Sequence, residues 1–300
     1  MARQPNHRQR PTNAQRPSTT SVPERVGTDR TRRGAADRTR RVLSQTFLHD
    51  RSAIKLFVRA AQPDPAQLTI EVGAGAGQLT RALAGSGTRL LAYEVDPAMF
   101  DRLRRCCADL PNVTPVPADF LSATAPDGPF AVVGNIPYAA TAPIVDWCLH
   151  ATGLRSATLV TQLEYARKRT GDFGHWSLLT VRTWPLFDWR LAGRIRRSAF
   201  RPVPRVDGGI LRLDRRPVPL LAPGSMPAYH RFVELGFSGV GGSVVASLRR
   251  AYPAGQVAGA ARATRLPPDT LAGAVWPEQW LAMFRLLSAG SRRRGAPPSG

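Results

Sequence analysis

A glycine-rich turn between a β-branched run and a helix-forming stretch constrains the fold of this chain more than any other feature. Residues 69–72 enter a turn in which Gly73, Gly75 and Gly77 alternate with alanine, and a helix-forming stretch follows at 78–83. Glycine lets the backbone turn tightly and lets a ligand approach without a Cβ in the way. The spacing differs from the dinucleotide pattern G-x-G-x-x-G, and the acidic Glu71 beside the loop disfavours a pyrophosphate. The turn therefore predicts a βα unit that accepts a nucleoside.

The next two expected strands end in carboxylates. Glu94 closes the strand expected near 89–94 and follows Gly73 by about 20 residues, the separation at which a βαβ unit delivers a carboxylate to ribose hydroxyls. Asp119 follows the strand expected near 113–117 and is suited to accept from an adenine amino group. Simpler explanations exist: Glu94 as a solvated residue at a strand end, and Asp119 as a helix cap. Because ligands of open α/β sheets bind outside the carboxyl ends of the strands, the three features together predict one nucleoside-cofactor crevice.

A fourth strand, expected near 130–134, leads into the tetrapeptide Asn135, Ile136, Pro137 and Tyr138. Asn135 offers a side-chain carbonyl, and Pro137 restricts the residue before it, which holds the Ile136 carbonyl outward. Tyr138 offers an aromatic face for stacking. Two acceptors and one flat ring fit a base with an exocyclic amino group, although a turn after a buried strand also explains these residues.

The order of the expected elements predicts the fold class. An amphipathic helix at 50–61 is expected to pack on the sheet edge, and strands alternate with helices through a fifth strand at 157–162 and a helix at 163–169. An antiparallel pair is expected at 184–191 and 208–213. This alternation predicts an α/β, Rossmann-like sheet, mostly parallel with an antiparallel edge. We expect this catalytic domain to span 42–216 and a small helical domain to span 217–290, with helices near 229–237, 244–252 and 279–287 and a short one after Pro267.

The charge of the chain indicates a nucleic-acid partner. Its 42 basic residues exceed its 21 acidic ones to give a net charge of +21, and only two of the 42 are lysine. Arginine binds phosphate in a bidentate way and stacks on bases. Residues 1–41 hold eleven arginines and three acids. They are expected to form a disordered arm, either binding RNA or acting as a passive solubilising tail, and 291–300 a short disordered tail.

Several classes of function are disfavoured. The three cysteines lack a C-x-x-C spacing and the five histidines are scattered, so no disulfide framework or metal site is expected. No run of 18 apolar residues exists, and we expect a cytoplasmic protein without a membrane segment.

Taken in order, the motifs resemble those of the ribosomal RNA adenine N6-methyltransferases. They lie at residues 44–48, 71–77, 93–96, 118–120 and 134–138, with a further likeness to the Phe-x-Pro-x-Pro-x-Val segment at 198–207. The resemblance implies S-adenosylmethionine as cofactor. It implies cofactor contacts at Thr46, Leu48, Gly73, Glu94, Asp119 and Asn135, and a catalytic set of Asn135, Ile136, Pro137, Tyr138 and Phe200. Thr46 departs from the usual Asn, and Phe200 either closes the second face of the base or is a core aromatic.

Within that family, Ile136 and the arginine-rich segment before Ser44 resemble the Erm branch. The likeness implies methylation of one adenine in the peptidyl-transferase region of 23S rRNA, with resistance to macrolides, lincosamides and streptogramin B. It also implies a monomer acting on an unassembled or partly assembled large-subunit precursor. One alternative is dimethylation of adenines in small-subunit rRNA. The other is a catalytically silent RNA-binding or transcription-accessory protein on the same fold.

Overall fold

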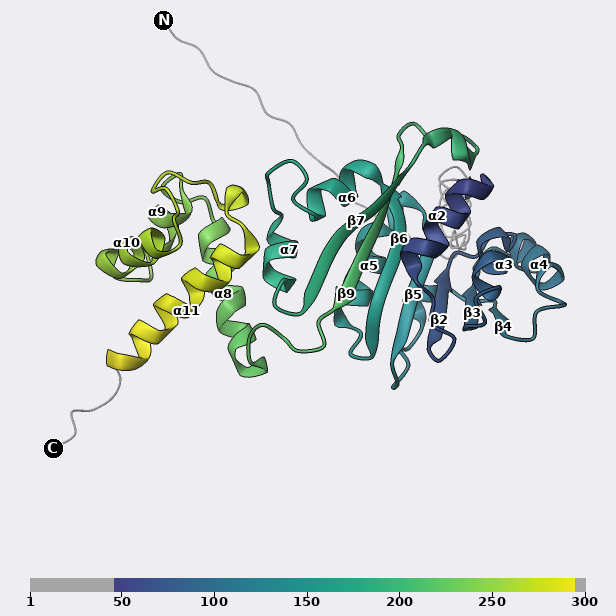
Figure 1. Ribbon diagram of the computed structural model, residues 1–300, viewed down its shortest axis with the longest axis horizontal. Helices are drawn as coiled ribbons and strands as arrows, with labels where there is room; N and C mark the ends of the chain where they lie inside the picture. The colour runs from purple at the N-terminus through teal and green to yellow at the C-terminus, as the bar shows by residue number, and fades with distance from the viewer. Residues whose placement is uncertain (1–45, 295–300) are drawn as a thin grey trace, which may run out of the picture. The chain divides into compact units, whose positions relative to one another are not determined.

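The computed structural model describes residues 46–294 (Figure 1). The expected arm at 1–41 therefore lies outside the described residues, as do 295–300 of the expected tail. Helix α11 spans Pro277–Arg294, and the start of the tail at 291 stays a prediction.

A seven-stranded sheet forms the centre of the described chain (Figure 1). Its strands, in spatial order, are β4 (Val113–Val116), β3 (Arg89–Tyr93), β2 (Leu68–Val72), β5 (Phe130–Asn135), β6 (Leu154–Gln162), β9 (Gly208–Arg215) and β7 (Phe187–Ile195). The first five strands are parallel, and β9 is antiparallel to both its neighbours. The predicted class, mostly parallel with antiparallel strands at one edge, is confirmed. The strand order reverses between β2 and β5, and such switch points are where ligands bind.

Alternating side chains give the sheet two apolar faces. Val132 and Val133 are both buried but belong to different hydrophobic clusters, as do Leu159 and Val160. This is the two-residue period of a strand that is covered on both sides. One cluster packs under α2 (Arg51–Ala61), α3 (Gln78–Ala84) and α4 (Pro97–Cys106), and the other under α5 (Thr141–His150), α6 (Leu163–Arg169) and α7 (Leu178–Thr183).

Helix α2 is anchored to the sheet by one buried arginine. Arg212 of β9 donates from Nη1 to the carbonyls of Ala60 and Ala61, both at 2.7 Å, and pairs with Asp214. Phe57 of the same helix is completely buried. The last carbonyls of a helix lack partners within it, so Arg212 satisfies groups that burial would otherwise penalise. The helix predicted at 50–61 is confirmed, and it contacts β6 and β9 as well as the edge strand β7.

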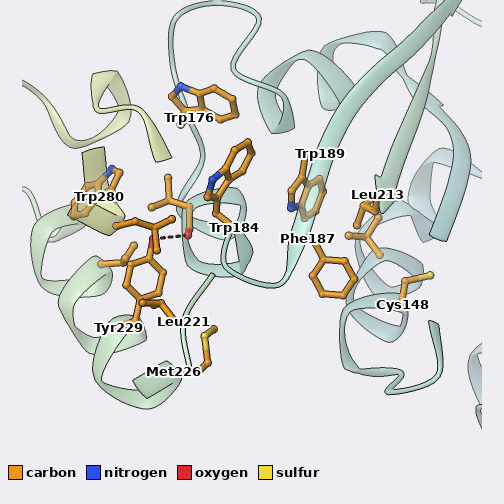
Figure 2. Packing of buried hydrophobic residues seen from close by; sticks show 14 of the residues in the cluster. Cys148, Trp176, Trp184, Phe187, Trp189, Leu213, Leu221, Met226, Tyr229 and Trp280 are labelled. Atoms are coloured by element: carbon orange, nitrogen blue, oxygen red, sulfur yellow. Dashed lines mark hydrogen bonds between the residues drawn. The ribbon is translucent and has the colours of Figure 1, made fainter. Parts of the chain in front are cut away.

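Four helices follow the sheet: α8 (Met226–Phe237), α9 (Val244–Leu248), α10 (Ala254–Ala263) and α11. One hydrophobic cluster continues from Phe187 and Trp189 of the sheet through Trp184 to Tyr229 and Trp280 of these helices (Figure 2). The Tyr229 hydroxyl donates to the carbonyl of Val181 at 3.0 Å. This one apolar cluster contains residues on both sides of position 217. The boundary expected there, between the catalytic domain and the helical domain, stays a prediction.

The helices at 229–237 and 279–287 are confirmed, with longer bounds. The helix predicted at 244–252 ends at Leu248, and the short helix predicted after Pro267 is a 3₁₀ turn at Ala272–Ala274. Over residues 46–294, none of the helices has the length and apolar character that crossing a bilayer requires.

A second, two-residue ladder lies apart from the main sheet. Strand β1 (Phe47–Leu48) pairs antiparallel with β8 (Phe200–Arg201), with Leu48 opposite Phe200. The backbone N–H groups of His49 and Asp50 continue the pairing by donating to the Ala199 carbonyl at 3.0 and 3.3 Å. This ladder joins the segment before the first helix to the segment before β9.

Candidate active site

The glycine turn after β2 is open towards the end of β5. Gly73 and Gly75 have φ values of 69° and 58°, which side chains rarely adopt. A Cβ on Gly75 would lie 2.9 Å from the ring of Phe47, whereas a Cβ on Gly73 would meet only the Asn135 carbonyl, at 4.0 Å. Phe47 therefore closes one side of the turn, and the space over Gly73 is left open opposite Asn135. This open cradle fits the cofactor site predicted at Gly73.

Glu94 fastens the glycine turn to the neighbouring strand. Its Oε2 accepts from the Gly75 N–H and its Oε1 from the Asp96 N–H, both at 2.8 Å, and only 3 % of the residue is exposed. The simple alternative of a solvated carboxylate at a strand end is therefore wrong. Each carboxylate oxygen has a further lone pair, so Glu94 can still accept from a ribose hydroxyl while it orders the turn.

Glu71 is a second buried carboxyl group beneath the turn, which the sequence suggested only as an unfavourable neighbour for phosphate. It is 1 % exposed, and its Oε2 has no hydrogen-bond partner within the described chain. Burial raises the pKa of Glu71 to about 7, the negative charge of Glu94 adds to this effect, and the Thr80 hydroxyl opposes it. The signal in the sequence was an acidic residue between the apolar Ile70 and Val72 of a short β-branched strand.

Asp119 acts as a cap in this structure. Its Oδ1 accepts from the Leu121 N–H at 3.0 Å and starts the 3₁₀ turn Phe120–Ser122, which is the simpler of the two roles expected for it. The next residue, Phe120, is buried. Its ring centroid lies 5.9 Å from that of Tyr93 and 4.4 Å from that of Trp147. The second carboxylate oxygen of Asp119 has the capacity for another bond. Its predicted contact with an adenine stays a prediction.

Asn135 ends β5 with its amide held in one orientation. Its Nδ2 donates to the Thr46 carbonyl at 2.6 Å. That bond leaves Oδ1 as the acceptor, which is the group expected to hold an amino nitrogen. Because Thr46 contributes through its backbone, its departure from the usual Asn leaves this contact intact. Ile136 is buried at 2 %, and Pro137 adopts φ −58° and ψ 133°, so both anchor the turn.

Tyr138 begins a 3₁₀ turn (Tyr138–Ala140) directly after Pro137. Its hydroxyl is buried, and no group of the described residues forms a hydrogen bond with it. Burial raises the pKa of Tyr138, and the negative charge of Asp207 adds to this, so the phenol stays neutral. The ring itself is only partly buried, as a stacking surface requires.

Two predicted site residues have their side chains in the core instead. Leu48 is 3 % exposed and Phe200 is 0 % exposed, and both belong to the cluster under α2. A Cβ on Gly208 would lie 3.0 Å from the Phe200 ring, so that face is packed against β9. The cause is the β1–β8 ladder, which places Leu48 and Phe200 opposite each other. Leu48 can therefore offer only its backbone, and Phe200 is a core aromatic in this conformation.

The sheet brings the remaining predicted residues to one edge. Gly73 follows β2 and Asn135 ends the adjacent strand β5. Glu94 follows β3 on the other side of β2, and Asp119 comes after β4, the strand beyond. Adjacent strands lie about 4.8 Å apart, so these residues lie close together at the switch point, where open α/β sheets bind their ligands. An open glycine turn, a buried acceptor beside it and an oriented amide opposite suit a nucleoside cofactor on one side and an amino-bearing base on the other.

The chain is similar to known rRNA adenine N-6-methyltransferases and to a 23S rRNA methyltransferase of known structure. The rRNA adenine N-6-methyltransferase of Streptomyces fradiae is 56 % identical over 252 residues, covering 83 % of this chain and 79 % of that one. The mycinamicin-resistance protein MyrB of Micromonospora griseorubida is 34 % identical, covering 82 % of this chain and 78 % of its own. The crystal structure of the 23S rRNA methyltransferase ErmE is similar with a TM-score of 0.79 and 47 % identity, covering 81 % of this chain and 99 % of that one.

The family model described as ribosomal RNA adenine dimethylase matches residues 36–289 of the chain. That range contains the glycine turn, both strand-end carboxylates and the Asn-Ile-Pro-Tyr turn, as well as α8, α9, α10 and most of α11. The chain therefore belongs to the ribosomal RNA adenine dimethylase family.

Proposed function

We propose that this protein transfers methyl groups from S-adenosylmethionine to N6 of one adenine in the peptidyl-transferase region of 23S rRNA. The resulting modification confers resistance to macrolides, lincosamides and streptogramin B. The observation that carries the proposal is the Asn135 amide, held by the Thr46 carbonyl at 2.6 Å with its acceptor oxygen left for an amino group. The likeness to ErmE and to MyrB supports the choice of 23S rRNA and of resistance.

The cofactor is assigned to the side of the crevice formed by β2, β3 and β4. The open space over Gly73 admits a ligand close to the backbone, and the buried Glu94 is the acceptor for ribose hydroxyls. Asp119 is assigned to the amino group of the cofactor's adenine, and Thr46 and Leu48 to backbone contacts. When bound, S-adenosylmethionine supplies an electrophilic methyl group on a sulfonium.

The target base is assigned to the end of β5. An adenine amino nitrogen is a weak nucleophile because its lone pair is delocalised into the ring. Asn135 Oδ1 and the Ile136 carbonyl accept its two N–H bonds, which favours a more tetrahedral nitrogen with its lone pair directed away from both acceptors. Tyr138 stacks on the ring and fixes its plane. Positioning of this kind supplies a large share of a rate enhancement.

The adenine must leave its stack to reach Asn135, which costs a few kcal/mol and less in a loop that is already unpaired. This cost favours an unassembled or partly assembled large-subunit precursor as substrate, in which the loop is accessible. The net charge of +21 supports binding to an RNA backbone. We assign the protein to the cytoplasm, acting as a monomer.

Primer extension on ribosomal RNA from a host that expresses this gene tests the proposal. A stop at one adenine in the peptidyl-transferase region of 23S rRNA, absent from a host expressing the Asn135→Ala variant, is the expected result. A signal in the small-subunit 3′ hairpin instead would select the small-subunit alternative. Unmodified ribosomal RNA of both subunits, with the protein present and folded, would select the catalytically silent alternative.

A further inference from the structure

A cleft outside the crevice described above opens beside the target-base residues. Its volume is about 460 Å³, and it is bounded by the first turns of α6, the turn after that helix and the loop before β9. The residues that line it are Leu163, Glu164, Arg167, Phe173, Arg197, Arg205, Val206 and Asp207. Strand β6, which leads directly into α6, is the neighbour of β5 and pairs with Asn135 through Val160. The cleft therefore lies one strand beyond the residue assigned to the target base.

A flat aromatic surface forms one wall of the cleft. Phe173 is 51 % exposed, an unusual exposure for a phenylalanine, and the Arg167 guanidinium lies 3.9 Å from its ring centroid. Asp172 pairs with Arg167 and fixes the guanidinium over the ring. Two stacked planar groups at a surface are the kind of platform on which nucleic-acid bases stack.

The cleft also carries positive charge that the described residues do not neutralise. Asp207 is engaged by Arg194, with Nη2 to Oδ2 at 2.6 Å, and by the Arg197 N–H at 2.8 Å. Arg205 is exposed, and within residues 46–294 its guanidinium has no hydrogen-bond or ion-pair partner. It is therefore available to a phosphate at no cost of breaking an existing pair.

Glu164, the second acidic residue of the cleft, favours a nucleotide over a simple anion as its ligand. Glu164, exposed in the first turn of α6, would repel a free phosphate but accepts hydrogen bonds from the amino or imino N–H groups of a base. A stacking platform, an acceptor and a separate free guanidinium together fit a base joined to a backbone phosphate.

We propose that this cleft holds a nucleotide adjacent to the target adenine, with its base stacked on the face of the Phe173 ring that Arg167 leaves open and its phosphate paired with Arg205. The inference rests on the proposed function and adds a second binding site on the same RNA strand. When the target adenine leaves the stack, its neighbour loses one stacking partner. The Phe173 platform replaces that partner and so offsets part of the cost of extrusion.

A hairpin RNA of the 23S peptidyl-transferase region tests this, with 2-aminopurine placed in turn on the 5′ and 3′ sides of the target adenine. Stacking quenches 2-aminopurine fluorescence, so the wild-type protein should quench one of the two probes. Phe173→Leu, which keeps apolar volume without a flat ring, should abolish the quenching and weaken hairpin binding about five-fold or more. Phe173→Trp should retain both, and S-adenosylmethionine affinity should be unchanged in all three proteins.

A second experiment tests the phosphate contact with the variant Arg205→Gln. Its matched control is Arg89→Gln, because Arg89 is an exposed arginine at the amino end of β3. Arg205→Gln should lower the slope of log affinity against log salt by about 0.7, the value for one contact to a single strand, while Arg89→Gln should not. No quenching of either probe by wild-type protein, or equal binding by the Leu and Trp variants, would overturn the inference. A wild type that binds but never methylates the hairpin would instead overturn the proposed function.

Discussion

The Gly75 N–H donates to the Glu94 carboxylate at 2.8 Å, so the glycine turn after β2 takes its shape from the residue directly after β3. Loss of that acceptor affects the cofactor pocket in two ways. It removes the proposed ribose acceptor, and it leaves the buried N–H of Gly75 and the part-buried N–H of Asp96 without their partner. A buried donor without a partner costs about 1–3 kcal/mol.

Glu94→Ala is therefore expected to weaken S-adenosylmethionine binding by about five-fold to more than 100-fold, from the loss of 1–3 kcal/mol. Isothermal titration calorimetry measures this directly. Asp101→Asn, which removes an exposed acid from α4, is the matched control and should bind as the wild type does. Wild-type affinity in Glu94→Ala would remove Glu94 from the cofactor site.

Asn135→Ala separates catalysis from cofactor binding. The variant loses the acceptor for the target amine and the bond to Thr46, while the groups assigned to the cofactor on β2 and β3 stay in place. We expect methyl transfer to fall about 100-fold or more, by analogy with the removal of one group that stabilises a transition state. S-adenosylmethionine affinity should be mostly retained, and the host should stay sensitive to macrolides. Near-full methylation of 23S rRNA by this variant would rule out the proposed mechanism.

Tyr138 is expected to act through its ring. Its hydroxyl forms no hydrogen bond within the described residues, so Tyr138→Phe loses no partner and should methylate at nearly the wild-type rate. Tyr138→Ala removes a stacking contact of about 1–3 kcal/mol and should lower kcat/KM for RNA accordingly. Steady-state kinetics on one RNA substrate compares the three proteins. Equal losses in the Phe and Ala variants would assign the function to the hydroxyl instead.

Glu71 predicts a pH dependence of stability. Its pKa rises from an ordinary value of 4.5 to about 7 on folding, so between these two pH values the folded state binds more protons than the unfolded state. Stability should therefore fall as pH rises from 4.5 through 7, by up to about 3 kcal/mol, and then level off. Thermal unfolding at several pH values measures this. Glu71→Gln should flatten the dependence and Asp101→Asn should not; identical pH profiles for Glu71→Gln and wild type would contradict the assignment.

Deletion of residues 1–41 tests the basic arm. The segment carries eleven arginines and three acids, so its removal should lower RNA affinity and make the slope of log affinity against log salt shallower. Filter binding over a range of salt concentrations gives both slopes. Equal slopes for the full-length and truncated proteins would favour the passive solubilising tail.

Local patterns in the sequence were enough to predict most of the sheet. Strands β2, β3, β4 and β5 lie within one or two residues of their predicted bounds, because each is a short β-branched or apolar run followed by a loop residue with a distinct chemistry. Helix α10 was not predicted because its sequence, rich in alanine and glycine, has few large apolar residues to show a helical period.

The burial of Leu48 and Phe200 could not be predicted in the same way. Both lie in motifs whose resemblance implied contact with ligands, and nothing in the neighbouring residues indicates that the two segments pair. The hydrogen bond from Gly75 to Glu94 was also missed, since a backbone donor leaves no mark in the sequence. Asp207 is a third case: its influence on Tyr138 arises from the return of β9 beside β6.

The two-residue ladder between β1 and β8 has a consequence for the order in which the protein is made. Thr46 and Phe47, which hold Asn135 and close the glycine turn, leave the ribosome early, but their segment acquires its antiparallel partner only when Phe200 and Arg201 have been synthesised. A nascent chain that stops after β6 contains every residue assigned to the cofactor and to the target base. It still lacks β8, the strand that pairs with β1 and so holds the segment of Thr46 and Phe47 in place. Methyl transfer is therefore expected to begin only with chains that extend beyond β8, which excludes activity from shorter translation products.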